Sequence, residues 1–159
     1  LELSPPTIPD GLEQLIARSR KLADEPLVAL EHFIDDWFRL LLEDRWYRQS
    51  FEILLNKTEL TAQMASTLKR ERKLTRDMVQ LLEALVGRSQ QTPGTGNCQS
   101  PRSLALLLYS SLMGITHTWL LSPKLFSLRE QTPFMASNLL ALVTSHAPSS
   151  VTSQASEGA

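Results

Sequence analysis

The chain has 159 residues, enough for one domain with a substantial core, and its 16 lysines and arginines nearly balance its 17 aspartates and glutamates. The resulting net charge of −1 excludes a strongly basic surface of the kind that holds DNA or an anionic membrane. The single cysteine, Cys98, excludes an internal disulfide. We therefore expect a cytoplasmic protein of one domain. Because the chain begins Leu-Glu-Leu without an initiator methionine, we also expect that its natural N-terminus lies further upstream.

The first two predicted helices follow a proline-rich start. Residues 1–9 contain three prolines, so we expect an extended entry segment or a broken helix end there. A modest apolar stripe with basic residues at its end predicts a first helix from Asp10 to Leu22. An acidic pair followed by Pro26 is a helix start signal, and it predicts a second helix from Pro26 to about Glu43.

A short helix and a long helix are predicted next. Asp44 can cap a third helix that ends near Lys57. Apolar residues at helical spacing predict a fourth helix that begins at Thr58 or Thr61. Gly87 is expected to end this fourth helix.

The fourth predicted helix contains a basic run, KRERK, at residues 69–73. A nucleic-acid patch would combine such a run with interleaved aromatic residues, which are missing here, and Glu71 interrupts the basic residues. Acidic residues nearby also balance the charge of the run. A solvated helix face is therefore the favoured interpretation.

The polar segment from Arg88 to Ser100 is typical of a surface loop, and Cys98 lies in it without a nearby histidine or second cysteine. Ser100-Pro101 then opens a helix whose run from Leu104 to Leu121 contains no charged residue unless His117 is protonated. A helix that is apolar on all sides is normally buried on every side, yet the chain around this one is short. A membrane span is less favoured, because serine, threonine and histidine interrupt the run.

The two faces of this run differ in composition. At about 100° per residue, one face collects bulky residues and one threonine: Ala105, Tyr109, Leu112, Met113, Thr116 and Leu120. The opposite face carries small residues at three- and four-residue spacing between leucines: Leu104, Leu107, Ser111, Gly114, Thr118 and Leu121. We infer that the first face serves the chain's own interior and that the second meets another chain. The alternative is that Gly114 only eases contact within the monomer.

The last helix has two possible starts. Ser127 has capping-box spacing, but Pro133 favours a start at Thr132 and an end near His146. Residues 147–159 are rich in serine, and we expect them to be disordered. No strand pattern appears, so the sequence predicts an all-α bundle of about six helices over residues 10–146. The apolar stripe of the last helix consists of Met135, Leu139, Leu142 and Val143.

Histidine and carboxylate placement gives little support for catalysis. The three histidines lie far apart, and none begins a metal or triad motif. The best metal candidate, His32 with Asp35 and Asp36 on one helix face, is an incomplete site without ligands from elsewhere. Exposed helix polarity is the favoured interpretation of these residues. We expect no catalytic residue, no metal and no cofactor, and hence no enzyme.

Aromatic and other apolar side chains gather on three predicted helices at positions that a bundle would bring together. Composition alone favours a filled core over a ligand cavity at these positions. The inner residues are Phe33, Ile34 and Trp37; Phe51, Leu54 and Leu55; and Tyr109, Leu112, Met113 and Thr116.

Two segments carry a resemblance to a known family. RWYRQSFEILLNKTELTAQMA at residues 45–65, followed by MGITHTWLLSPKLF at residues 113–126, resembles the C-terminal regulatory domain of TetR-family repressors. The nearest likeness is to the AcrR/TtgR-type regulators of multidrug efflux. The resemblance implies a ligand cavity and a homodimer in this domain. DNA reading would belong to an N-terminal helix-turn-helix unit that precedes the residues of this chain.

The resemblance also assigns roles to the predicted helices. It implies that the ten inner residues line the cavity and that the first helix ends a connecting helix to the DNA readers. The last two helices would build a four-helix bundle across the dimer axis, through the small-residue face and the last apolar stripe.

Related regulators have polar residues at the places of Phe51, Leu55 and Met113. This departure predicts a more lipophilic ligand, planar or aromatic, with Tyr109, Thr116 and Glu59 as the few polar anchors. A dimerisation module with a filled core and no ligand stays open as the alternative. A helical metalloenzyme using His32 is the weaker third hypothesis.

Overall fold

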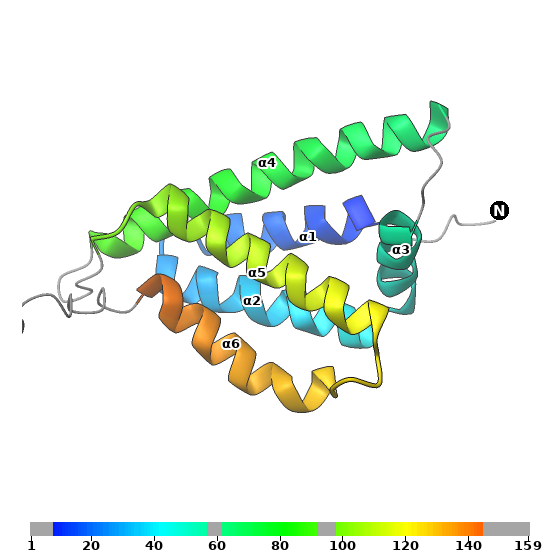
Figure 1. Cartoon of the computed structure of the whole chain (residues 1–159). Coiled ribbons are helices and arrows are strands. Elements are labelled where there is room, and N and C mark those ends of the chain that lie inside the picture. The colour runs from blue at the N-terminus through cyan, green and yellow to red at the C-terminus, as the bar shows by residue number, and fades with distance from the viewer. Residues whose placement is uncertain (1–7, 57–61, 92–97, 145–159) are drawn as a thin grey trace, which may run out of the picture.

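The computed structural model is a bundle of six α-helices that describes residues 8–56, 62–91 and 98–144 (Figure 1). No strand occurs within these ranges, and the predicted all-α fold is confirmed. The helices in chain order are α1 (Ile8–Lys21), α2 (Pro26–Glu43), α3 (Arg45–Asn56), α4 (Ala62–Gln90), α5 (Pro101–Leu121) and α6 (Leu128–Thr144).

Helix α2 holds the centre of the bundle, where it packs against α1, α4 and α6. The long helix α4 lies beside α5 and α1, and the short helix α3 lies across one end (Figure 1). The core is one continuous cluster to which all six helices contribute. Its largest fully buried side chains are Trp37, Tyr47, Phe33, Phe38 and Phe51.

Two helix starts are capped as the sequence predicts. The Asp44 carboxylate accepts a hydrogen bond from the backbone N–H of Tyr47 at 3.1 Å, at the start of α3. The Ser100 hydroxyl accepts one from the N–H of Ser103 at 3.3 Å, and Pro101 occupies the first turn of α5. Each contact satisfies a donor that the first turn of a helix leaves without an intrahelical partner.

Helix α6 starts at Leu128, so the predicted start at Thr132 is wrong. The Ser127 hydroxyl accepts a hydrogen bond from the N–H of Glu130 at 3.2 Å, which caps the helix one turn earlier. Pro133 then lies inside the helix. Its missing N–H leaves the carbonyl of Arg129 without its usual partner, and both residues are exposed, so water can supply one.

Helix α4 continues past Gly87 to Gln90, so the prediction that Gly87 ends it is wrong. A glycine inside a helix costs about 1 kcal/mol relative to alanine, but tertiary contacts hold this turn in place. The Arg88 guanidinium donates a hydrogen bond to the carbonyl of Ala23 at 2.7 Å. A side chain at Gly87 would lie 3.7 Å from the ring of Pro101, in ordinary contact with the start of α5.

Helix α1 begins at Ile8, two residues before the predicted start. The remainder of the predicted entry segment lies outside the described residues, as does the predicted tail at 147–159.

Candidate functional site

Three predicted groups of inner residues meet around the indole of Trp37. The ring centroid of Trp37 lies 6.3 Å from that of Phe33, 6.1 Å from that of Phe51 and 6.1 Å from that of Tyr109. These distances are typical of favourable contacts between aromatic rings. Helices α2, α3 and α5 therefore build one aromatic cluster, as their apolar stripes predict.

The polar edge of Trp37 is satisfied inside the chain. Its Nε1–H donates a hydrogen bond to the Thr116 hydroxyl at 3.0 Å, and this hydroxyl donates to the carbonyl of Leu112 at 2.7 Å. Ile34 and Leu112 are also buried, while Met113 is half-buried. Side chains at 54, 55 and 59 lie outside the described residues.

Tyr47 extends this cluster toward α1, and the sequence prediction of the site missed it. Its ring meets Phe51 edge-on at a centroid distance of 5.0 Å, and the side chain is 1% exposed. A Cβ atom added to Gly11 would lie 2.5 Å from the Tyr47 ring, so only glycine allows this approach of α1. The sequence signal that could have identified Tyr47 is its four-residue spacing from Phe51, which places both side chains on one face of α3.

Glu71 is buried at 9% exposure, so the prediction of a solvated face is wrong for this residue. Its basic neighbours at 69, 70, 72 and 73 are exposed, as predicted. Glu71 precedes Leu74 by three residues and Met78 by seven, which puts it on the inner face of α4. Burial raises the pKa of its carboxyl to about 7, against an opposing effect of Arg70.

Glu71 belongs to a polar cluster that we define as Tyr47, Glu71, Thr75 and Tyr109. The hydroxyls of Thr75 and Tyr109 share a hydrogen bond at 3.1 Å. Burial raises the pKa of both tyrosines, and the Glu71 charge raises them further.

The opposite face of α5 forms a groove with α6. This groove has a volume of about 490 Å³, and a Cβ atom added to Gly114 would have no atom within 4 Å apart from its chain neighbours and the backbone of its own helix. The alternative that Gly114 eases a contact within the monomer is therefore wrong for the described residues. The groove is lined by Ser111, Gly114, Ile115, Thr118, Phe126, Met135 and Leu139.

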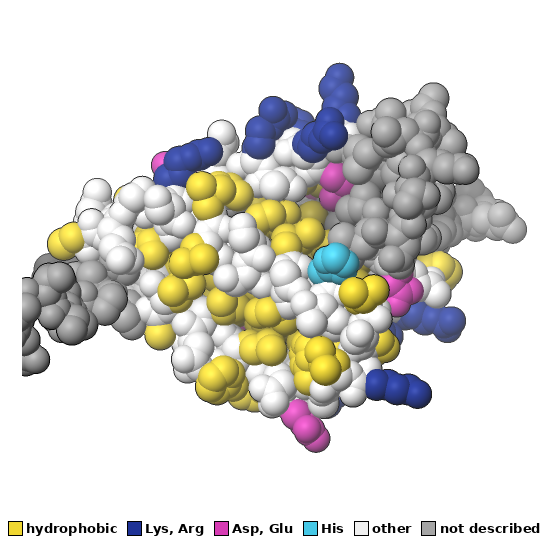
Figure 2. All heavy atoms as spheres, viewed as in Figure 1, with side chains coloured by type: hydrophobic (Ala, Val, Ile, Leu, Met, Phe, Trp, Pro, Cys, Tyr) yellow, Lys and Arg dark blue, Asp and Glu magenta, His cyan; other side chains and the backbone are white. Residues whose placement is uncertain are grey.

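Apolar side chains surround this groove on the surface, and Figure 2 shows them gathered over α5 and α6. Leu107 is 49% exposed, Leu121 69% and Leu142 38%, whereas Leu104 and Val143 of the predicted interface are buried in the chain's own core. Further exposed residues in this region are Leu106, Leu125 and Phe134. Among the described helices, α5 is also the one long and apolar enough to cross a membrane.

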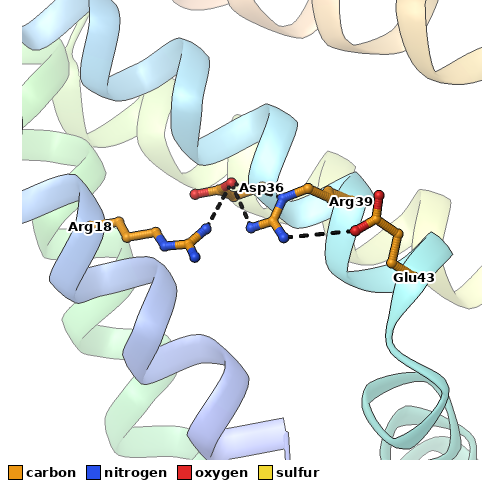
Figure 3. Close-up of polar contacts among 4 residues, drawn as sticks. All are labelled: Arg18, Asp36, Arg39 and Glu43. Carbon is orange, nitrogen blue, oxygen red and sulfur yellow. Dashed lines mark hydrogen bonds and ion pairs between the residues drawn. The ribbon is translucent and has the colours of Figure 1, made fainter.

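One of the candidate metal ligands on α2, Asp36, is engaged in ion pairs. The Asp36 carboxylate accepts hydrogen bonds from Arg18 at 3.3 Å and from Arg39 at 2.9 Å, and Arg39 also pairs with Glu43 at 3.9 Å (Figure 3). His32 is exposed. No group of three potential metal-binding side chains occurs in the described part of the chain.

Comparison with known proteins gives one family. The model for the C-terminal region of MAATS-type transcriptional repressors matches residues 25–145, which include α2 to α6. A search among curated proteins found no significant match.

Proposed function

This chain belongs to the TetR family, since it matches the C-terminal region of repressors of that family, and we propose that its helices form a ligand-sensing and dimerising regulatory domain. A lipophilic or aromatic small molecule binds among the inner residues and shifts the homodimer out of its operator-binding arrangement. Such a ligand acts only through its different affinities for the two arrangements. Within the family we propose the AcrR/TtgR type, with DNA read by an N-terminal helix-turn-helix unit.

The observation that carries the ligand proposal is the convergence of three helices on Trp37. A ligand that separates Trp37 from Phe51 or Tyr109 has to move α2, α3 and α5 relative to one another. These helices would therefore report occupancy of the site to the rest of the bundle.

Helix α1 is the route by which occupancy would reach the DNA readers. The ring of Tyr47 lies directly against Gly11, so movement of α3 displaces α1. Ion pairs also tie α1 to its neighbours: Arg18 to Asp36 of α2, and Glu13 to Arg70 of α4 at 3.2 Å. This arrangement supports the role of a connecting helix.

The groove on the outer face of α5 supports the homodimer. It is apolar, it is continuous with exposed leucines, and Gly114 allows a second backbone to approach closely. A second copy of the chain in this groove would also explain the apolar surface of α5 without a membrane. That explanation agrees with membership of a family of transcriptional repressors. Symmetric pairing of two copies is the commonest way in which soluble chains cover such a face.

Tryptophan fluorescence tests the ligand site. In a variant with Trp46→Phe and Trp119→Phe, Trp37 is the remaining tryptophan, and we expect saturable quenching by planar lipophilic compounds. The matched control is Trp37→Phe with the other two tryptophans intact, in which the saturable component should disappear. Flat titrations across a broad panel of such compounds would contradict the proposal.

The second candidate function is a dimerisation module with a filled core, which the full burial of Trp37 and its bond to Thr116 favour. The half-buried Met113 distinguishes the two candidates. In a sensing domain, Met113→Ala changes the affinity for lipophilic compounds. In a dimerisation module it lowers stability alone, and no compound binds.

A further inference from the structure

The outward face of α4 carries a row of cations. Four exposed side chains share this face at spacings of three and four residues, and they span about 10 Å along the helix. Figure 2 shows lysine and arginine side chains gathered along the edge of the molecule that α4 forms in Figure 1. We call this row the basic stripe, and it consists of Lys69, Arg72, Lys73 and Arg76.

The chain itself neutralises the basic stripe only in part. Lys73 pairs with Asp77 at 3.1 Å, whereas Arg72 and Arg76 form no ion pair with another described residue. Leu74 and Met78 on the other side of α4 are buried in the core, so the stripe points away from the bundle. Two guanidinium groups about one turn apart can therefore bind the carboxylates of a partner.

A cleft between α2 and α6 has the opposite charge. Its volume is about 260 Å³, and its two carboxylates lie four residues apart on one face of α2. We call it the acidic cleft, and it is lined by Glu31, Asp35, Pro133, Ala136, Ser137 and Leu140.

The two carboxylates of the acidic cleft lack compensating charge. Both side chains are exposed, and neither forms a hydrogen bond or ion pair with another residue that the structure describes. Partial burial raises the pKa of Asp35, and the charge of Glu31 raises it further, against an opposing effect of His32. A cationic partner would relieve this repulsion.

The two charged surfaces match in spacing but do not meet within one chain. Glu31 and Asp35 are four residues apart on one helix, and so are Arg72 and Arg76 on another, which spaces each pair by about 6 Å along its helix. In Figure 1 the part of α4 that carries the stripe lies on the opposite side of the bundle from α6, with α5 and α2 between them. A contact between stripe and cleft therefore needs a second copy of the chain.

Both surfaces stay open in the proposed homodimer. At about 100° per residue, Ser137 and Leu140 of the acidic cleft lie on the side of α6 opposite to Met135, which lines the groove between α5 and α6. The basic stripe lies on α4, which does not line that groove. The net charge of −1 also means that copies do not repel one another at long range.

We propose that the basic stripe of one copy docks against the acidic cleft of another, so that dimers associate head to tail. The two arginines of the stripe donate hydrogen bonds to Glu31 and Asp35, because a planar guanidinium fits a carboxylate. The aliphatic part of an arginine side chain lies against the apolar residues of α6 that line the cleft. Because the contact joins two different surfaces, it can extend beyond one pair of copies. It goes beyond the proposed function, since it needs neither the ligand nor the groove of α5.

Sedimentation velocity of the full chain over a protein concentration series tests this contact. We expect species larger than the dimer at about 25 mM salt and dimers alone at about 500 mM, because salt screens charges at a surface. The association constant above the dimer should fall at least about tenfold between the two conditions. A chain that is dimeric at both salt concentrations would overturn the head-to-tail contact and leave the α5 groove in place. A chain that is monomeric at both would contradict the groove and the contact alike.

Charge reversal assigns the contact to the named residues. Arg72→Glu with Arg76→Glu should abolish the larger species at low salt, and so should Glu31→Arg with Asp35→Arg. Larger species that persist in either variant would show that the other copy binds elsewhere.

The matched control places the same change of charge on another helix. Arg20→Glu with Lys21→Glu alters the net charge as much as the stripe variant does, at exposed residues near the end of α1. The larger species should remain in this control. Their loss to the same extent as in the stripe variant would mean that net charge, and not the basic stripe, governs association.

A charge swap gives a result that damage to the fold would not produce. All four reversals in one chain make the stripe acidic and the cleft basic, and they restore the net charge of −1. We expect the larger species to return at low salt, although each reversed pair alone abolishes them. Their continued absence in the swapped chain would refute the pairing of stripe with cleft.

Discussion

The two faces of α5 differ in how far the protomer itself covers them. On the inner face, Leu112 and Thr116 are fully buried. The Thr116 hydroxyl accepts a hydrogen bond from the indole of Trp37, which lies 79 residues earlier in the chain. On the outer face, Gly114 and Thr118 line an open groove, and the Ser111 hydroxyl donates a hydrogen bond back to its own helix, at the carbonyl of Leu107.

The two faces differ in how much of their apolar area is covered, and in whether their polar atoms are paired, by other helices of the same chain. The inner face is covered by α4 and by the Trp37 side chain of α2, and its Tyr109 and Thr116 hydroxyls are paired within the chain. The outer face leaves leucines in water at 49% and 69% exposure, at Leu107 and Leu121. A protein surface of this kind is typical of an interaction site. The inner face therefore contributes to the stability of the protomer, and the outer face is the one that we propose for association.

Removal of Trp37 from the inner region should destabilise the protomer more than any substitution on the outer face of α5. Trp37→Ala leaves a cavity where Phe33, Phe51 and Tyr109 now meet, and we expect it to lower the free energy of unfolding by about 3–5 kcal/mol. Urea denaturation at a fixed protomer concentration measures this loss. Trp46→Ala is the control, since this side chain is 51% exposed, and it should cost under about 1 kcal/mol. Similar losses in both variants would contradict the assignment of Trp37 to the centre of the core.

A leucine at Gly114 should separate association from folding. Gly114→Leu puts a large side chain where a second backbone is proposed to approach, and we expect the dimer dissociation constant to rise about 10- to 100-fold or more. The protomer should be stabilised by up to about 1 kcal/mol, because glycine is a poor helix former and the added Cβ meets open space. Sedimentation velocity over a concentration series measures the first effect.

The control for this prediction adds a leucine elsewhere on the surface. Ala84 is an exposed residue of α4, and Ala84→Leu should leave the dissociation constant unchanged. A Gly114→Leu variant that stays dimeric with the same dissociation constant would show that the association face lies elsewhere.

Glu71 makes the stability of the inner region depend on pH. Because folding raises the pKa of this carboxyl from 4.5 to about 7, the folded chain holds the proton more tightly than the unfolded chain does. The free energy of unfolding is therefore highest below about pH 4.5 as far as Glu71 is concerned, and it falls as the pH rises toward 7 and slightly above.

The loss should be about 1–2 kcal/mol, less than the full shift implies, because Glu71 keeps some contact with solvent. Glu71→Gln should remove this part of the pH dependence, which urea denaturation between pH 5 and 8 can measure. The difference between the two proteins isolates Glu71 from the other titrating groups. Parallel curves for both proteins would contradict a buried, titrating Glu71.

Local patterns were sufficient to predict most of the fold. The spacing of apolar residues predicted α2 at Pro26–Glu43 and α5 at Pro101–Leu121 without error, because each has a clear start signal and a long stripe. The misplaced ends at Gly87 and Pro133 have a common cause. Both residues disfavour a helix locally, and in both places other contacts outweigh that preference. Near Gly87 this is the long-range bond from Arg88 to Ala23, which the sequence does not display, and before Pro133 it is the Ser127 cap, which the sequence offered as the other possible start.

The site was harder to predict than the fold, because it depends on which residues depart from their usual environment. Helical phase correctly brought Trp37, Phe51 and Tyr109 together. It missed Glu71, since a carboxylate in a basic run is normally solvated, and it missed Tyr47, since its distinguishing contact is with Gly11, 36 positions earlier. Burial of polar side chains depends on the packing of several helices and is not encoded in one stripe.

Removal of one hydroxyl from each face of α5 should give the smallest effects, and it compares the contributions of the two faces most directly. Tyr109→Phe removes a bond between α5 and α4 and leaves Thr75 without this partner, so it should cost about 1 kcal/mol. Ser111→Ala removes a bond within α5 alone, and replacing a serine that bonds back to its own helix should change stability by under about 0.5 kcal/mol. Both are measured by urea denaturation in the Gly114→Leu background, where contacts between the two copies are weakened. Equal losses would mean that the two faces of the helix contribute alike to the stability of the protomer, and they would contradict the difference drawn between them.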